Sequence, residues 1–173
     1  MTLVSAVADL LRHMEWADAL ILKTVLSSPA ASTDQALHNR LYHLHVTQHA
    51  FLQVWRGQTT NLPTVDTLDA QSLAQWAQAF YEKSTADTFG FDEESLGRCV
   101  PDTLLSKAEE RLGSGSTAPT IGDTVLQVVT HSTYHRGQIS TRLRELGCDP
   151  PLTEYFVWVW RGKPSADWPV GAL

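Results

Sequence analysis

Apolar residues recur at helical spacing from the start of the chain. The first periodic segment runs from Leu3 to Leu26 and is closed by Ser27-Ser28-Pro29. Because apolar positions three and four residues apart share one face of a helix, this segment predicts a long amphipathic helix. A second helix is predicted from a capping box made by Ser32 and Gln35 to a point near Gly57.

The middle of the chain predicts one more long helix and a long connection. The third helix begins at Asp69 or a neighbour and ends near Asp87. Glycine and proline then interrupt the pattern over residues 89–119, which we interpret as a connection within one domain. It leaves room for an extended piece near residues 98–100 and a helical piece near residues 104–112.

The fourth helix has the clearest boundaries. Thr120 and Asp123 have the spacing of a capping box, and Gly147 is typical of a helix end. A short, very apolar closing helix is predicted from Thr153 to Trp160. Four long amphipathic helices with one extended crossover predict an all-α four-helix bundle, in which binding sites are commonly built from facing side chains.

Length and composition exclude several classes of protein. The chain has 173 residues, which predicts a single domain over 1–173. Its net charge is −6 without a long run of Lys or Arg, which disfavours nucleic-acid binding. The longest apolar run, Tyr155 to Trp160, is too short to span a membrane, and no signal peptide is evident, so we expect a cytoplasmic protein. Cys99 and Cys148 stand alone and indicate neither a disulfide framework nor a cysteine-based zinc site.

Histidine is the distinctive residue, with seven in the chain. His131 and His135 are four residues apart and therefore lie on one face of the fourth helix. His135 projects within roughly 40° of apolar Val128 and Ile139, so we expect the pair to point into the bundle. Neutral imidazoles are good ligands for Zn²⁺, Ni²⁺ or Fe²⁺. A third ligand must then come from another helix.

The second helix offers candidates for that third ligand. His45 and His49 form their own pair on one flank, which we interpret first as a solvated helix surface. His43 projects from the opposite flank, and spacing alone does not choose between the two flanks. The single histidines His13 and His38 are interpreted as structural or exposed.

Several segments of the chain match the motifs of one known protein family. Residues 131–139 read H-x-x-x-H-R-G-Q-I, and residues 143–147 continue as L-R-x-x-G, as in the family signature. Residues 16–18 (Trp-Ala-Asp) look like its first-helix element, and His43 followed by Gln48 and Phe51-Leu52 looks like its second-helix element. Residues 150–156 are similar to its closing helix. Through these segments the chain resembles the DinB/YfiT-like family of metal-dependent enzymes.

The resemblance implies the same four-helix bundle and a choice of metal ligands. In the family, one histidine of the second helix and the H-x-x-x-H pair of the fourth hold the metal, which by position are His43, His131 and His135. Two positions depart from the family pattern. Glu154 stands where the family often has Asp, and His49 stands where it often has a charged residue.

Three neutral imidazoles leave a bound ion its positive charge and an open position, as in catalytic zinc sites. Such an ion can activate a water or a small thiol. The relatives implied by the resemblance are thiol-dependent S-transferases or isomerases that use bacillithiol, mycothiol or glutathione. We therefore expect a divalent-metal-dependent thiol S-transferase acting on small electrophiles, and the resemblance also implies a homodimer. The alternatives are a metal-dependent hydrolase and a non-enzymatic, metal-stabilised binding protein.

Four residues near the signature are candidate supporting groups: Tyr134, Arg136, Gln138 and Glu154. Arg136 is a candidate for binding an anionic substrate group. Gln138 and Glu154 are candidates for orienting the second nitrogen of a histidine ligand. The alternative interpretation is that Arg136 and Gln138 only tie the fourth helix to its neighbours.

Overall fold

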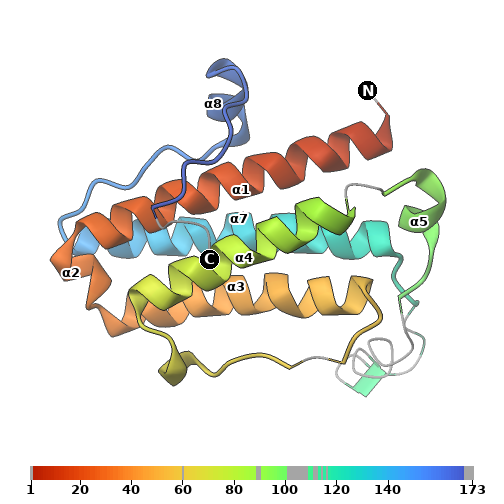
Figure 1. Ribbon diagram of the computed structural model, residues 1–173, viewed down its shortest axis with the longest axis horizontal. Coiled ribbons are helices and arrows are strands. Elements are labelled where there is room, and N and C mark those ends of the chain that lie inside the picture. The colour runs from red at the N-terminus through yellow and green to blue at the C-terminus, as the bar shows by residue number, and fades with distance from the viewer. Residues whose placement is uncertain are drawn as a thin grey trace.

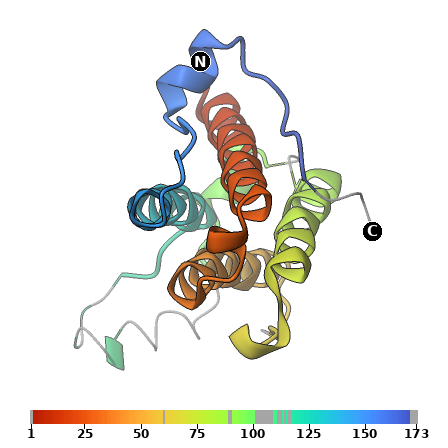
Figure 2. The ribbon, with the colours of Figure 1, turned by 90° about the vertical axis from the view of Figure 1, so that its left-hand side faces the viewer.

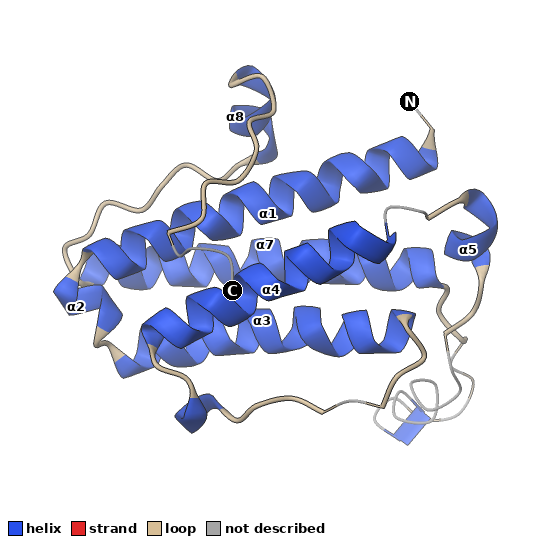
Figure 3. Cartoon of the chain, in the orientation of Figure 1, coloured by secondary structure: helices blue, strands red, loops and turns tan. Residues whose placement is uncertain are grey.

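Four long helices make up the body of the protein. The computed structural model describes residues 2–59, 61–88, 91–100, 109–110, 113, 115 and 117–169. The long helices are α1 (Leu3–Ser27), α3 (Gln35–Trp55), α4 (Ala70–Thr88) and α7 (Ile121–Glu145), shown side by side in Figure 1. Figure 3 shows helices and loops and no strand in the described part of the chain. The predicted all-α fold is confirmed.

Shorter helices lie in the connections between the long ones and after α7. They are α2 (Pro29–Ser32), the 3₁₀ turn η1 (Val65–Thr67), α5 (Glu93–Gly97) and α8 (Tyr155–Trp160). The extended piece predicted near residues 98–100 is present, because Cys99 forms an isolated antiparallel bridge with Thr120. The helical piece predicted near residues 104–112 lies mostly outside the described residues. Only residues 109–110 of this range are described, and they are helical.

The four helices occupy the corners of a square in the end view of Figure 2. α3 contacts α7 and α4, and α1 contacts the same two helices. α1 and α7 run in one direction, and α3 and α4 run in the other (Figure 1). The crossover that returns along the whole bundle is therefore the connection between α3 and α4, whereas α4 ends and α7 begins at the same end of the bundle.

The helices begin and end close to the predicted positions except at the starts of α8, which begins at Tyr155 and not at Thr153, and of α3. The predicted cap, Ser32, ends the separate turn α2. The cap of α3 is Asp34, whose Oδ1 accepts a hydrogen bond from Leu37 N at 2.7 Å. The prediction was wrong because Pro29, at the first position of α2 and behind the Ser28 cap, starts a turn of its own. At α7 the predicted capping box is present.

A buried polar network joins the four long helices at one level. Asp18 of α1 accepts hydrogen bonds from Arg136 Nη1 of α7 at 2.7 Å, Gln48 Nε2 of α3 at 2.7 Å and the Tyr81 hydroxyl of α4 at 2.5 Å. Gln48 also donates to Ser132 Oγ at 3.1 Å. Burial, together with the nearby Asp18 carboxylate, raises the pKa of Tyr81 well above its usual range, so its hydroxyl stays a donor. The network sets the register of all four helices.

The flank of α3 that carries His45 and His49 is buried, so its interpretation as a solvated surface was wrong. His45 is 1% exposed and donates from Nδ1 to Gln48 Oε1 at 2.9 Å. His49 is 6% exposed, stacks on Trp76 with ring centroids 4.2 Å apart, and donates from Nε2 to the Trp76 carbonyl at 2.8 Å. α4 packs over this flank, and no sequence period of α3 alone reveals that contact.

The two single histidines brace connections against the bundle. His13, which is buried, hydrogen-bonds the carbonyl of Thr153 through Nε2 at 2.8 Å. His38 hydrogen-bonds the carbonyl of Leu68 in the same way at 2.7 Å. Both contacts join residues far apart in the sequence, which supports the structural interpretation of these histidines.

Buried His49 makes the stability of the fold depend on pH. Burial lowers its pKa from 6.5 to about 4, so the unfolded chain binds a proton more readily than the folded chain. The stabilisation is complete above about pH 6.5 and is lost as the pH falls toward 4, by about 3 kcal/mol in total. Urea unfolding in EDTA at pH 7.5 and pH 5 measures this loss. His49→Gln keeps a donor without the titration and is expected to show a smaller loss; an equal loss in both chains would contradict the assignment.

None of the helices in the described part of the chain is long and apolar enough to cross a lipid bilayer.

Candidate metal centre

Three histidines from two helices converge on one point. His43 comes from α3, and His131 and His135 come from α7. Each offers one ring nitrogen, and these nitrogens all lie within 4.8 Å of one another. The ring centroid of His43 lies 5.2 Å from that of His131 and 4.6 Å from that of His135. The structure thus brings together the three residues that the resemblance implied, and leaves His45 and His49 out of the cluster.

The cluster lies on the seam between α3 and α7, not in the interior as predicted. His43 is exposed, and His131 and His135 are half-buried. Around α7, these two lie roughly 100° and 60° to one side of buried Ser132, and buried Arg136 lies about 40° to the other. The interior at this level is occupied by the polar network, so the histidines face the outer edge of the helix pair.

The electrostatics of the cluster favour neutral imidazoles at the two histidines of α7. Burial, together with the neighbouring His135 and His43, lowers the pKa of His131 to about 4. Burial also lowers the pKa of His135, with a smaller contribution from His43. A neutral imidazole keeps the lone pair that binds a metal ion, so the rings of His131 and His135 are ready to act as ligands near pH 7.

The surroundings of the two α7 rings show which nitrogens are available to an ion. His135 donates from Nδ1 to Oε1 of Gln138 at 2.9 Å, which leaves the Nε2 lone pair free for an ion. Nδ1 of His131 is buried and has no hydrogen-bond partner among the described residues. A buried ring nitrogen without a protein partner fits a site whose missing partner is a metal ion. Three nitrogen donors suit Zn²⁺, Ni²⁺ or Fe²⁺.

Gln138 was a candidate for orienting a histidine ligand, and its side chain contacts Nδ1 of His135. We expect Gln138→Ala to weaken metal binding by 10- to 100-fold, roughly the range for loss of such a partner, because His135 loses its fixed ring orientation. Gln138→Glu keeps an acceptor and should retain most of the affinity. Competition with a chelating dye measures the change. Gln127→Ala, an exposed glutamine on the same helix, is the control, and equal losses in both alanine variants would contradict the role.

The other candidates have different surroundings. The guanidinium of Arg136 is 2% exposed and ion-paired with Asp18. Arg136 therefore binds this buried carboxylate and is not available to bind an anionic group of a substrate, the role that the sequence had suggested. Tyr134 is 66% exposed and lies edge-on to His135, with ring centroids 5.1 Å apart. Glu154 is exposed at the start of α8, which packs on α1 and stands away from the α3–α7 seam in Figure 2.

One residue at the seam was missed by sequence reasoning. Arg40 precedes His43 by three residues, a spacing that places both on neighbouring positions of one helix face. The H-x-x-x-H pattern indicated a site on α7, whereas Arg40 on α3 is part of no motif. The available signal was a positive charge three residues before a candidate metal ligand.

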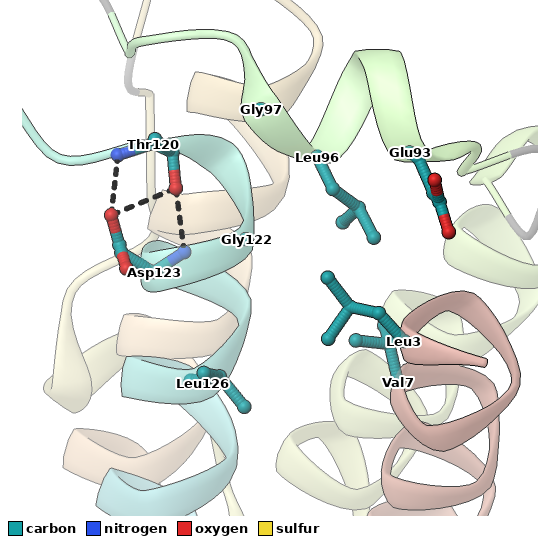
Figure 4. A pocket seen from close by; sticks show the side chains of 9 residues that line it. All are labelled: Leu3, Val7, Glu93, Leu96, Gly97, Thr120, Gly122, Asp123 and Leu126. Atoms are coloured by element: carbon teal, nitrogen blue, oxygen red, sulfur yellow. Dashed lines mark hydrogen bonds between the residues drawn. The ribbon is translucent and has the colours of Figure 1, made fainter. Parts of the chain in front are cut away.

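A cavity of about 240 Å³ lies at another place, where α5 covers the beginnings of α1 and α7. Figure 4 shows that its polar groups at α7 belong to the capping box, in which the Asp123 carboxylate accepts from Thr120 N and Oγ1. The side chains of Leu3, Val7 and Leu96 make the rest of the wall largely apolar. This cavity contains no histidine and is separate from the three-histidine cluster.

Comparison with known proteins gave one family match. The chain matches the DinB family over residues 4–163. Neither the curated proteins nor the solved structures include a match to it. The matched range spans all four long helices and contains His43, His131 and His135.

Proposed function

The chain belongs to the DinB family, whose members are typically metal-binding, and from this membership we propose that it is a divalent-metal-dependent enzyme. We propose further that it is a thiol S-transferase that acts on small electrophiles. The observation that carries the proposal is the convergence of His43, His131 and His135, with candidate ligand nitrogens within 4.8 Å of one another.

The composition of the cluster favours a catalytic over a structural site. Structural zinc sites are closed by four protein ligands, whereas catalytic sites have three and keep an open position. The cluster groups three histidines, and His43 is exposed, so small molecules can approach from solvent. A divalent ion held there supplies Lewis acidity, which lowers the pKa of a coordinated water or thiol.

The residues of this chain have separate tasks in such a site. His43 and the α7 pair would hold the ion. Gln138 holds the ring of His135 in one tautomer through the contact to Nδ1. Tyr134 places a phenol ring beside His135 at the exposed rim, where it can contact a substrate. The buried network around Asp18 keeps α3 and α7 in the register that the cluster needs.

Elemental analysis followed by a thiol panel tests the proposal. Protein purified without a histidine tag is assayed for bound metal, and is then loaded with Zn²⁺, Ni²⁺ or Fe²⁺. Loss of the free thiol is followed with bacillithiol, mycothiol and glutathione, each with an alkyl halide and an epoxide. We expect transfer to one thiol class that stops when EDTA removes the metal.

Two other outcomes would contradict the transferase. Ester or amide hydrolysis without added thiol would replace the transferase by a hydrolase. No reaction, with a large loss of melting temperature in EDTA, would replace it by a metal-stabilised binding protein.

A further inference from the structure

Arg40 borders the three-histidine cluster on the α3–α7 seam. It lies one turn before His43 on α3, and its Nη1 donates to the backbone carbonyl of Gln138 on α7 at 3.3 Å. The side chain of Gln138 in turn accepts from His135. Gln138 therefore links the guanidinium of Arg40 to His135, a predicted metal ligand. The Arg40 side chain is partly buried and still reaches solvent.

The charge of Arg40 has no carboxylate partner among the described residues. The nearest acidic group along α3 is Asp34, and both of its oxygens are already used. Arg142 binds them through Nε at 3.1 Å and Nη2 at 2.7 Å, and Oδ1 also caps α3. The pKa of Asp34 is lowered first by its hydrogen bond to Arg142, and Arg40 adds only a longer-range attraction. A guanidinium has five donors, and Arg40 uses one of them in a long bond.

The other arginines near the seam are committed to internal partners. Arg136 is ion-paired with Asp18 inside the bundle, and Arg142 is ion-paired with Asp34 and Glu145. Partly desolvated cations are stabilised by an acceptor, and a carboxylate accepts two parallel hydrogen bonds from one guanidinium. Arg40 is thus the seam arginine with donors left for an anion from solution.

We propose that Arg40 is an anion-binding subsite of the metal centre and binds the carboxylate of the small molecule that coordinates the ion. The identity of the bound molecule, a thiol that carries a carboxylate, rests on the proposed function. It places the recognition of negative charge on α3, beside His43, and not at Arg136, which the sequence had suggested. Arg40 would select among substrates, while the three histidines hold the metal.

Ligand binding to the Co²⁺-loaded protein tests the subsite without any turnover. The first pair of probes is 3-mercaptopropionate and 3-mercaptopropionamide, which differ in charge and little in shape. The second pair is glutarate and its monoamide, which have no thiol. Changes in the cobalt absorption spectrum report binding. The chains compared are the native protein, Arg40→Ala, Arg40→Lys and a control, Arg144→Ala. Arg144 is exposed and lies about 180° from His135 around α7, so the control removes the same charge elsewhere.

The native chain is expected to prefer the member of each pair that has a carboxylate where the other has an amide. Arg40→Ala should weaken binding of that member by about tenfold, which is the loss typical of one charge-assisted contact, and leave binding of the amide unchanged. Arg40→Lys should recover part of the preference, and Arg144→Ala should keep all of it. Unchanged preference in Arg40→Ala, or loss of cobalt from that variant, would overturn the subsite. If neither thiol binds but the glutarate pair behaves as expected, the subsite stands and the thiol transferase does not.

Discussion

Replacing His135 by alanine is expected to remove bound metal from the purified protein. The cluster offers three nitrogen ligands, so each one carries a large share of the binding free energy. Four-ligand zinc sites have apparent binding free energies of roughly 10–16 kcal/mol, or about 2.5–4 kcal/mol for each ligand. Loss of one ligand should therefore weaken binding on the order of a hundred- to a thousand-fold. The same result is expected for His43→Ala and His131→Ala.

Elemental mass spectrometry and competition with a chelating dye measure this loss. His38→Ala is the matched control, since it removes an imidazole from α3 whose contact is the carbonyl of Leu68 and not the cluster. Circular dichroism in EDTA checks that each variant is folded. Stoichiometric metal in all three cluster variants would show that the ion is bound elsewhere, and the proposed site would be abandoned.

Replacing Asp18 by alanine is expected to cause the largest loss of stability in the chain. Its carboxylate is 1% exposed and is ion-paired with Arg136, whose side chain is 2% exposed. Without Asp18, a buried guanidinium has no counter-charge, and Gln48 and Tyr81 lose their shared acceptor. Breaking a buried pair in this way typically costs about 3–5 kcal/mol. Urea unfolding at pH 7 in EDTA should show a decrease of that size in the free energy of unfolding.

Two comparisons separate the buried pair from a general charge effect. Lys23→Ala breaks the exposed pair with Asp167 and should change stability little, because solvent screens both groups. The double variant Asp18→Leu, Arg136→Met removes both charges and is expected to be more stable than Asp18→Ala alone. If Asp18→Ala unfolds at the same urea concentration as the native chain, the network does not hold the helices together.

The two predictions concern residues on neighbouring faces of α7. Ser132 and Arg136 of α7 point into the network, while His131 and His135 on the adjacent positions point to the seam. A four-residue repeat on one helix therefore serves both the core and the metal site. This arrangement explains why the signature is dense along α7, since partners on another element or in the cluster are found for His131, Ser132, His135, Arg136 and Gln138.

Part of the site was predictable from the sequence because it depends on spacing within one helix. The separation of His131 and His135 by four residues places them together on any α-helix. The helices themselves were predictable for the same reason, since apolar periodicity and caps such as Thr120 with Asp123 are local. The choice of His43 needed the family resemblance, because three other histidines of α3 offered the same chemistry.

The remainder depended on contacts between helices. That His45 and His49 are core residues follows from the packing of α4 on α3, and that Arg136 pairs with Asp18 follows from the position of α1. The sequence by itself determined the four helices and the pair of histidines on α7, because these features arise from residues within a few turns of each other. Only the tertiary structure decided which flank of α3 faces solvent, where the cluster lies and that Arg40, among the described arginines at the seam, has no carboxylate partner. Those properties depend on the neighbours that long-range packing supplies, and no local period encodes them.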